Sequence, residues 1–316
     1  MTAEAPVVDG GPGPLDYFFQ WLDGEFGRAE PRRHALRYLR GLLEPAGAGA
    51  AASGAEDGRN RLLTTAQWDE GSVRDRVREM VLACMGSDES VLVVAEDGFL
   101  KKGNGSAGVA RQYSAASGRI DNYQIGLFLL HVDPRGTACA VDRELLVPQS
   151  RAEDPVHRER TGIPARPELS FREDLALAMV ERALDAGAPA RWVTADAPYY
   201  GENPAFRAAL ERRGTPYVLL SHTSGPPVTR TPADDGFAHW RLGREGGGSY
   251  LCYAPSDTGV DELVAVAARR TTAAGYFASA RREAGLDRYS VRKWRAWYRH
   301  MTLAMFAHAF LAATRS

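Results

Sequence analysis

Asp196 is the side chain in this sequence that is best placed for acid–base chemistry. It directly follows a short apolar run, Ala190–Ala195, that we interpret as a buried strand. A carboxylate held in a cleft can act as a general acid or base, and it can equally serve as a structural hydrogen-bond acceptor. We keep both interpretations open. The side chains that could assist Asp196 in catalysis are Asp97, Tyr199, Tyr200 and Arg270.

Adjacent lysines at positions 101 and 102 could bind an anion. Only three of the 39 basic residues are lysines, so this pair is unusual in this chain. Lysine offers a compact point charge, whereas arginine offers a planar fork. A solvated loop is the alternative interpretation. The residues that we consider for binding nucleic acid or another anion are Lys101, Lys102, Arg111, Arg281, Arg292 and Lys293.

The stretch from residue 91 to 103, VLVVAEDGFLKKG, closely resembles the first catalytic strand of bacterial insertion-sequence transposases with a DDE site. That strand reads roughly Val-Val-Asp-Glu-Thr-Gly-Phe-x-Lys-Lys-Gly, and its Asp is the first metal-binding carboxylate. Ala95 stands at that position. The resemblance extends over roughly residues 68–314, through segments at 107–126, 142–145, 192–201 and 285–304.

The resemblance implies a two-metal site in which three carboxylates hold Mg²⁺ ions and so stabilise the attacking and leaving oxygens. Asp196 matches the second carboxylate. The third belongs to a helical pattern similar to Tyr-x-x-Arg-x-x-x-Glu-x-x-x-x-x-x-Lys, which falls here on Ala267, Arg270, Ala274 and Arg281. Two of the three carboxylates are therefore replaced, by Ala95 and Ala274. We expect no metal cofactor and no cutting or transposition of DNA.

Neighbouring carboxylates could compensate for Ala95. Side chains alternate along a strand, so Glu96 should point away from the side of Ala95. Asp97 shares that side but lies two residues further along, about 6.6 Å away. Whether Asp97 takes over the role of the missing carboxylate stays open.

The pattern of apolar residues predicts an α/β fold: an RNase H-like mixed sheet flanked by helices. We expect a small helical N-terminal region at residues 1–88, a core at 89–316, and a Pro/Gly-rich insertion at about 222–255 before the late helices. Expected helices are Leu15–Phe26, Pro31–Leu43, Gly71–Met85, Arg172–Ala186, Asn203–Arg213, Asp261–Glu283 and Lys293–Ala313, with a flexible connector at 45–58. Expected strands are Val91–Val94, Tyr123–His131, Ala138–Val147, Ala190–Ala195, Pro216–Ser221, Ala238–Leu242 and Tyr250–Tyr253.

The composition is that of a soluble globular protein, with 44% apolar and 25% charged residues. No run of about 18 apolar residues is present, and the N-terminus lacks the features of a secretory signal. We therefore expect a cytoplasmic protein without a membrane span. Its three widely spaced cysteines argue against a disulfide framework.

Basic residues are concentrated at the C-terminal end. Residues 264–316 contain ten Lys or Arg and two Asp or Glu, a net charge of +8, so the rest of the chain carries −9. This segment could contact DNA phosphates or could neutralise the acidic remainder of the molecule. We consider three functions: a domesticated DNA-binding protein, a metal-independent enzyme that uses a small-molecule substrate in the former cleft around Asp196, and a pseudoenzyme that acts through protein partners.

Overall fold

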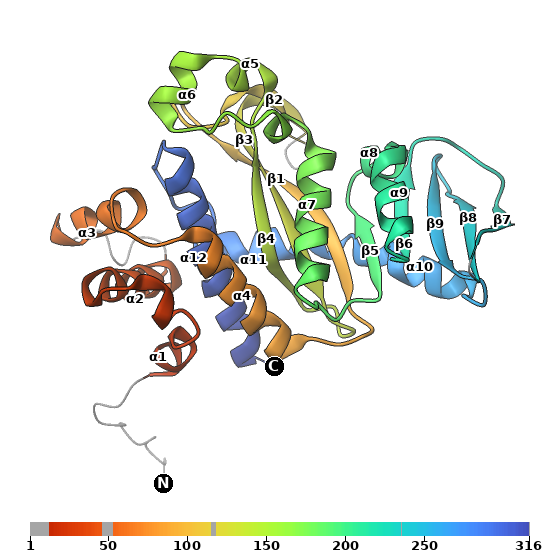
Figure 1. Ribbon diagram of the computed structural model, residues 1–316, viewed down its shortest axis with the longest axis horizontal. Coiled ribbons are helices and arrows are strands. Elements are labelled where there is room, and N and C mark those ends of the chain that lie inside the picture. The colour runs from red at the N-terminus through yellow and green to blue at the C-terminus, as the bar shows by residue number, and fades with distance from the viewer. Residues whose placement is uncertain (1–12, 46–52, 115–117, 235, 316) are drawn as a thin grey trace, which may run out of the picture.

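The computed structural model describes residues 13–45, 53–114, 118–234 and 236–315, and in these ranges it forms a nine-stranded mixed sheet flanked by helices (Figure 1). The expected α/β class is confirmed. The N-terminal helices lie at one end of the molecule, and the last three strands lie at the other. No helix within these ranges is long and apolar enough to cross a membrane.

Five strands form the central part of the sheet. Strands β1 (Val91–Leu100), β3 (Arg119–Val132) and β4 (Ala138–Leu146) are antiparallel neighbours. Strands β5 (Trp192–Ala195) and β6 (Tyr217–Ser221) continue the sheet beyond β1 and run parallel to it. The order β4-β3-β1-β5-β6 is that of the RNase H-like core predicted from the sequence.

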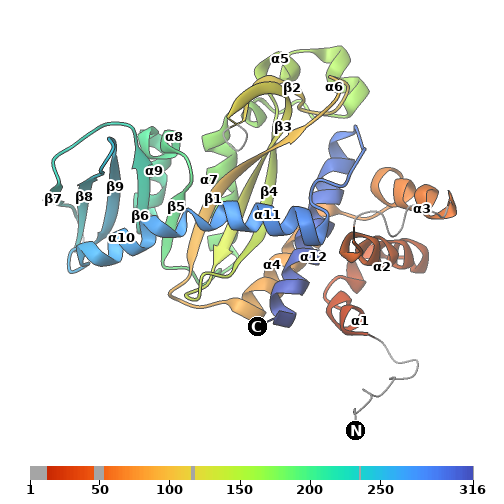
Figure 2. The ribbon, with the colours of Figure 1, turned by 180° about the vertical axis from the view of Figure 1, so that it is seen from behind.

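Helices cover both faces of this sheet, which explains the uninterrupted apolar run in β1. Helix α7 (Arg172–Asp185) crosses one face in Figure 1, and α11 (Thr272–Ala284) crosses the opposite face in Figure 2. The shorter helices α8 (Pro198–Glu202) and α9 (Pro204–Arg212) connect β5 to β6. Residues Leu92–Ala95 of β1 are completely buried between these layers.

Helices make up most of the described residues that precede β1. They are α1 (Pro14–Phe19), a 3-10 helix (Asp23–Phe26), α2 (Ala29–Leu43), α3 (Ser53–Thr64) and α4 (Glu70–Met85). Helices α2, α3 and α4 pack against α12 (Trp294–Arg315), the last helix of the chain. Their apolar side chains belong to the same buried cluster as those of the sheet.

The last three strands extend the sheet as an antiparallel meander. Strands β8 (Phe237–Gly243) and β9 (Ser249–Pro255) match the strands expected near 238–242 and 250–253. An edge strand, β7 (Val228–Pro232), was not expected because its sequence, VTRTP, is exposed along its whole length and carries no apolar alternation. Proline at the end of an exposed edge strand discourages further pairing.

Several elements differ from the prediction. The expected helix Asp261–Glu283 is two helices, α10 (Val260–Arg269) and α11. The polar stretch 148–169 contains α5 (Gln149–Ala152), α6 (Pro155–Thr161) and the start of a 3-10 helix (Pro167–Ser170), and β2 (Ala110–Ser114) pairs with the start of β3. The expected helix Leu15–Phe26 is α1 followed by the first 3-10 helix. Of the expected connector 45–58, residues 46–52 lie outside the described residues, and α3 already begins at Ser53.

Candidate functional site

Ala95 and Asp196 are neighbours across the parallel pair of β1 and β5. The last paired residues are Val94 and Ala195, and the Asp196 N–H donates to the carbonyl of Val94 at 3.0 Å. The Asp196 side chain then accepts a hydrogen bond from the Glu96 N–H at 3.1 Å. The position matched to the first family carboxylate therefore lies beside the second, and it carries only a methyl group.

The Asp196 carboxyl is held in a poorly solvated position. Burial, reinforced by the negative charge of Glu96, raises its pKa to about 7, although the nearby Arg270 acts in the opposite direction. One of its oxygens, Oδ1, is buried and has no hydrogen-bond partner. A carboxyl group of this kind can exchange a proton near neutral pH.

Glu96 points to the face of the sheet that α7 covers, opposite to the side of Asp97. Its Oε1 accepts a hydrogen bond from Tyr200 at 2.7 Å and a second from Tyr199, and it lies 3.4 Å from Nε of Arg172. The Arg172 guanidinium also lies over the Tyr199 ring, 5.1 Å from its centroid. The two tyrosines proposed from the sequence are therefore partners of Glu96, and both have a raised pKa because of burial and the charge of Glu96.

Asp97 is buried on the opposite face and forms an ion pair with Arg281 of α11. Their side chains approach to 2.6 Å, and Arg281 also donates to the carbonyl of Gly98 at 3.2 Å. Burial raises the pKa of Asp97, and the charge of Arg281 partly offsets this effect. The arginine at the position of the family's helical lysine thus already has a carboxylate partner.

Arg270 is placed by the break between α10 and α11. The hydroxyl groups of Thr271 and Thr272 donate to the carbonyls of Ala268 and Arg269, at 2.8 and 2.7 Å, and so compete with the regular helical pattern. Arg270 is half-buried, and its Nε has no hydrogen-bond partner. Its charge acts against the rise in the pKa of Asp196.

The two alanines of the helical pattern have different environments. Ala267 is buried on α10, whereas Ala274 is exposed on α11, one turn beyond Arg270. In the part of the chain that the structure describes, no three side chains of His, Cys, Asp or Glu are grouped so that they could hold a metal ion.

The two adjacent lysines have different surroundings. The Lys101 ammonium lies 3.4 Å from the centroid of the Tyr289 ring, and burial lowers its pKa to about 8. Lys102 is exposed. The lysine that can meet an external anion is therefore Lys102.

Several other exposed basic residues lie on segments near Lys102, at the end of the sheet where β2 and β3 form a hairpin. The backbone joins this region to the start of α12, because the Ala107 N–H donates to the carbonyl of Arg292 at 2.9 Å. We call the exposed residues Lys102, Arg111, Arg292 and Lys293 the tip surface. Lys293 also donates to the carbonyl of Arg160 on α6 at 2.5 Å.

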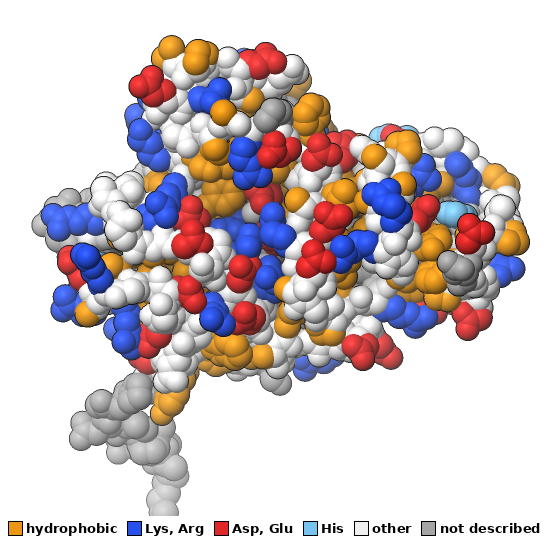
Figure 3. Space-filling view, in the orientation of Figure 1, with side chains coloured by type: hydrophobic (Ala, Val, Ile, Leu, Met, Phe, Trp, Pro, Cys, Tyr) orange, Lys and Arg blue, Asp and Glu red, His pale blue; other side chains and the backbone are white. Residues whose placement is uncertain are grey.

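Apolar side chains accompany the charges of the tip surface. Tyr113 and Ile120 are directly paired across β2 and β3, and they are 58% and 60% exposed. Arg111 shares their face of the hairpin because it lies two residues from Tyr113. Basic side chains elsewhere are interspersed with acidic ones over the face seen in Figure 3. The tip surface thus combines cations with an exposed aromatic ring.

The basic C-terminal segment is largely engaged within the molecule. Arg299 is fully buried and donates to the carbonyls of Leu62, Leu63 and Trp68. Arg295 pairs with Glu70, Arg288 donates to the carbonyls of Leu42 and Glu44, and Arg315 pairs with Glu283. These contacts favour the interpretation that the segment neutralises and fixes other parts of the chain.

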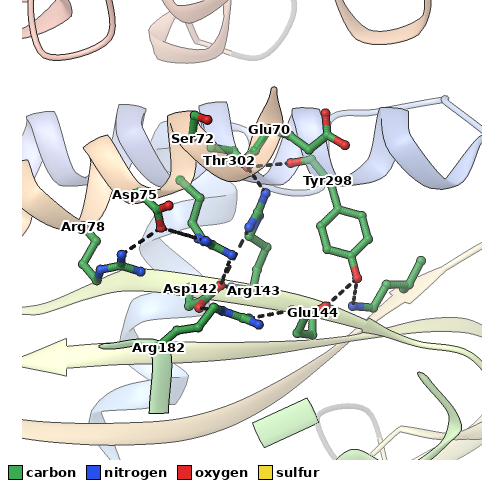
Figure 4. Close-up of polar contacts among 12 residues, drawn as sticks. Glu70, Ser72, Asp75, Arg78, Asp142, Arg143, Glu144, Arg182, Tyr298 and Thr302 are labelled. Atoms are coloured by element: carbon green, nitrogen blue, oxygen red, sulfur yellow. Dashed lines mark hydrogen bonds and ion pairs between the residues drawn. The ribbon is translucent and has the colours of Figure 1, made fainter. Parts of the chain in front are cut away.

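The motif Asp142-Arg-Glu-Leu145 forms a buried ionic network rather than an open site (Figure 4). Arg182 of α7 reaches Asp142 at 2.9 Å and Glu144 at 2.6 Å. Tyr298 donates to Glu144 at 2.7 Å and accepts from the Leu145 N–H at 3.1 Å. The network ties the edge strand β4 to α7 and α12.

Arg172 and Arg182 were not singled out from the sequence, and the pairing of Tyr298 with Glu144 was not predicted. Each belongs to a helix and pairs with a strand residue between 38 and 154 positions away in the chain. The motif at 142–145 could have indicated that Asp142 and Glu144 have such partners. Two acidic residues on one side of a buried strand require cationic or hydroxyl partners.

Two sequence comparisons find relatives of this chain. A sequence profile described as a DDE superfamily endonuclease matches residues 22–224. A probable transposase for insertion sequence element IS701 from Microchaete diplosiphon is 24% identical over 164 residues, which cover 52% of this chain and 40% of that protein. The chain thus spans two fifths of the length of this relative.

Among solved structures, the piggyBac transposase synaptic complex with hairpin DNA is similar, with a TM-score of 0.45 and 10% sequence identity. The similarity covers 95% of this chain and 71% of that one.

Proposed function

Because the chain belongs to the DDE superfamily of endonucleases, we propose that it is a DNA-binding protein that has lost two-metal cleavage. The observation that carries the proposal is that Ala95 directly follows the last paired residue of β1, beside Asp196, where the family pattern has two carboxylates. DNA contact is assigned to the tip surface.

The side chains around Asp196 do not fit a pair of Mg²⁺ ions. Hard divalent cations require several oxygen ligands, and position 95, beside Asp196, carries only a methyl group. Glu96 lies on the other face, where two tyrosines and Arg172 hold it. Asp97 is paired with Arg281. No cleavage step through bound metal is therefore assigned to this protein.

The tip surface has the composition of a nucleic-acid interface. Lysine and arginine side chains neutralise phosphates, and an exposed aromatic ring can stack on a base. Lys102, Arg111 and Arg292 are exposed there, and Arg111 shares the face of Tyr113. In contrast, the arginines of the C-terminal helix have internal partners.

Fluorescence anisotropy with random-sequence duplex DNA at two salt concentrations tests this proposal. Binding should weaken steeply with salt. Replacing Lys102, Arg111 and Arg292 together by Ala should reduce the salt dependence by about one unit of slope for each phosphate that is no longer neutralised. Incubation of the same DNA with Mg²⁺ should leave it uncut.

A matched triple variant controls for the loss of charge. Arg33, Arg37 and Arg212 are exposed on α2 and α9, away from the tip. Replacing these three by Ala removes the same charge and should leave the affinity close to that of the wild type. Equally weakened binding in both triple variants, or no binding at low salt, would overturn the DNA assignment.

A metal-independent enzyme that uses the cleft around Asp196 is the second candidate. It is favoured by the unpartnered Oδ1 of Asp196 and Nε of Arg270, two polar atoms that a ligand could satisfy. Native mass spectrometry of the protein incubated with metabolite extracts would detect such a ligand. If Asp196→Asn retains the same ligand and any associated turnover, Asp196 has no role in that chemistry.

A further inference from the structure

A pocket of about 510 Å³ lies at the end of the sheet where β3 turns into β4, between this turn, α11 and α12. It is remote from the tip surface, because β3 pairs Val132 with Val91 at this end of β1 and Tyr123 with Leu100 at the other. Its volume is within the range of small-molecule sites. Neither Asp196 nor any tip residue lines it.

Two helices provide its walls. Thr272, Gly275, Tyr276 and Ser279 come from α11, and His308, Leu311, Ala312 and Arg315 come from α12. Both sets follow the i, i+3, i+4, i+7 spacing of a single helix face. The Tyr276 and His308 rings meet edge to face, with their centroids 4.8 Å apart. The wall is thus aromatic and aliphatic, and Thr272, Tyr276 and Ser279 carry its hydroxyl groups.

His308 contributes no positive charge at neutral pH. Its Nε2 lies 2.6 Å from Oγ of Ser279. Burial lowers its pKa to about 4, an effect that Arg315 strengthens and Glu283 opposes. The charge of the pocket therefore comes from its rim.

Arginines dominate this rim. Arg135 pairs with Asp133 at 3.0 Å and Arg315 with Glu283 at 2.5 Å, yet their side chains are 62% and 61% exposed. Arg269 donates to the carbonyl of Pro134 at 2.7 Å, and its guanidinium lies against Gly136. The two arginines of the lining, Arg135 and Arg315, thus each pair with one carboxylate and keep most of their side-chain surface exposed. Because each guanidinium has five N–H donors, donors remain for a ligand.

We propose that this pocket binds a small organic anion, such as an aromatic carboxylate or phosphate. The apolar part of the bound anion lies against Tyr276, His308 and Leu311. The anionic group of the same ligand faces Arg135 and Arg315. The site is independent of DNA binding at the tip.

Ligand-observed NMR with four probes of similar size tests the proposal. Benzoate and phenyl phosphate should bind, and competition between them shows which anion is preferred. Benzamide, which has the same ring without a charge, and benzylamine, which has the opposite charge, should bind at least about tenfold more weakly. Failure of both anions to bind at millimolar concentration, or binding of benzamide as tight as that of benzoate, overturns the proposal.

Two variants locate the binding. Arg315→Ala should weaken benzoate binding about tenfold, the usual effect of removing a charge-assisted hydrogen bond. Gly275→Leu should abolish it, because a Cβ at Gly275 meets no atom within 4 Å and the larger side chain then occupies the pocket. The control, Ala265→Leu, changes an exposed position on α10. Unchanged benzoate binding by Gly275→Leu would place the ligand elsewhere and overturn the assignment.

Discussion

Oδ2 of Asp196 accepts a hydrogen bond from the backbone N–H of Glu96 at 3.1 Å. The backbone ladder between β5 and β1 ends one step earlier, with the Asp196 N–H bonded to the carbonyl of Val94. The side-chain oxygen therefore occupies the place that a backbone carbonyl would fill if the parallel pairing continued. Asp196 thus has a structural role that does not depend on metal binding.

Replacing Asp196 by Asn should stabilise the protein above pH 7. The folded-state pKa of about 7 is raised relative to the ordinary value of 3.8, so the folded protein binds the proton more tightly than the unfolded chain. The wild type therefore loses stability as pH rises from about 4 through 7, whereas Asn stays neutral. Urea unfolding of both proteins between pH 4 and 9 should show a difference that grows with pH and levels off above 7.

Asp196→Ala serves as the control for the hydrogen bond. Asn keeps an acceptor for the Glu96 N–H, but Ala leaves it unsatisfied, which should cost about 1–3 kcal/mol at every pH. A stability difference between wild type and Asn that is the same at pH 4 and pH 9 would contradict the raised pKa.

Most of the central fold could be predicted from the sequence. The apolar runs in β1, β5 and β6 are continuous because both faces of the sheet are covered, and such runs are easily recognised. The alternation of side chains along β1 correctly predicted that Glu96 and Asp97 point to opposite faces of the sheet. It could not predict that Arg172 and Arg281 come from opposite faces to hold these two carboxylates, because such pairings depend on tertiary packing.

The late helices were harder to predict. Apolar periodicity continues across Arg270, and the break depends on the hydroxyl groups of Thr271 and Thr272. The net positive charge of residues 264–316 was apparent from the sequence, but the partners of these basic side chains were not. Arg299 contacts main-chain carbonyls of residues 62, 63 and 68. Every residue has a main-chain carbonyl, so the sequence does not indicate which of them an arginine will contact.

Restoring two carboxylates should create Mg²⁺ affinity. In Ala95→Asp/Ala274→Glu, the first new carboxylate lies beside Asp196 and the second lies one turn from Arg270, whose charge already acts on Asp196. Without metal, the buried Asp at position 95 should destabilise the fold through repulsion from Asp196. Differential scanning fluorimetry should therefore show a lower melting temperature that Mg²⁺ raises.

The same double variant with Asp196→Asn is the control for the metal. It keeps both new carboxylates but lacks the central one, so Mg²⁺ should no longer change its melting temperature. If Mg²⁺ has no effect on the double variant itself, position 274 is not the third carboxylate position.

Tyr298→Phe should destabilise the protein by about 1–3 kcal/mol, because the hydroxyl both donates to Glu144 and accepts from the Leu145 N–H. Phe leaves both groups buried without this partner. Urea unfolding measures the change, and Tyr17→Phe, at a ring that is 60% exposed, is the control. A destabilisation no larger than that of Tyr17→Phe would mean that the network does not depend on Tyr298.

Arg299→Met should loosen the N-terminal helices. The guanidinium contacts three main-chain carbonyls and lies 3.3 Å from Glu70, and it is stacked 4.7 Å from the Trp68 ring. Removing one member of a buried ion pair typically costs about 3–5 kcal/mol. Hydrogen exchange should accelerate in α3 and in the start of α4. The exposed Arg292→Met is the matched control, and equal exchange in the two variants would contradict a structural role for Arg299.

Lys101 and Lys102 should differ in their contribution to DNA binding, although they are adjacent in sequence. Lys102→Met removes an exposed charge of the tip surface and should weaken binding and reduce its salt dependence by about one unit of slope. Lys101→Met should have little effect, because the Lys101 ammonium lies over the Tyr289 ring.

For the same reason, raising the pH from 7 to 9 neutralises Lys101 through its pKa of about 8 without lowering the DNA affinity of the wild type. Anisotropy titrations of the three proteins at both pH values measure this. A fall in wild-type affinity near pH 8 that is absent in Lys101→Met would show that Lys101 contacts DNA directly.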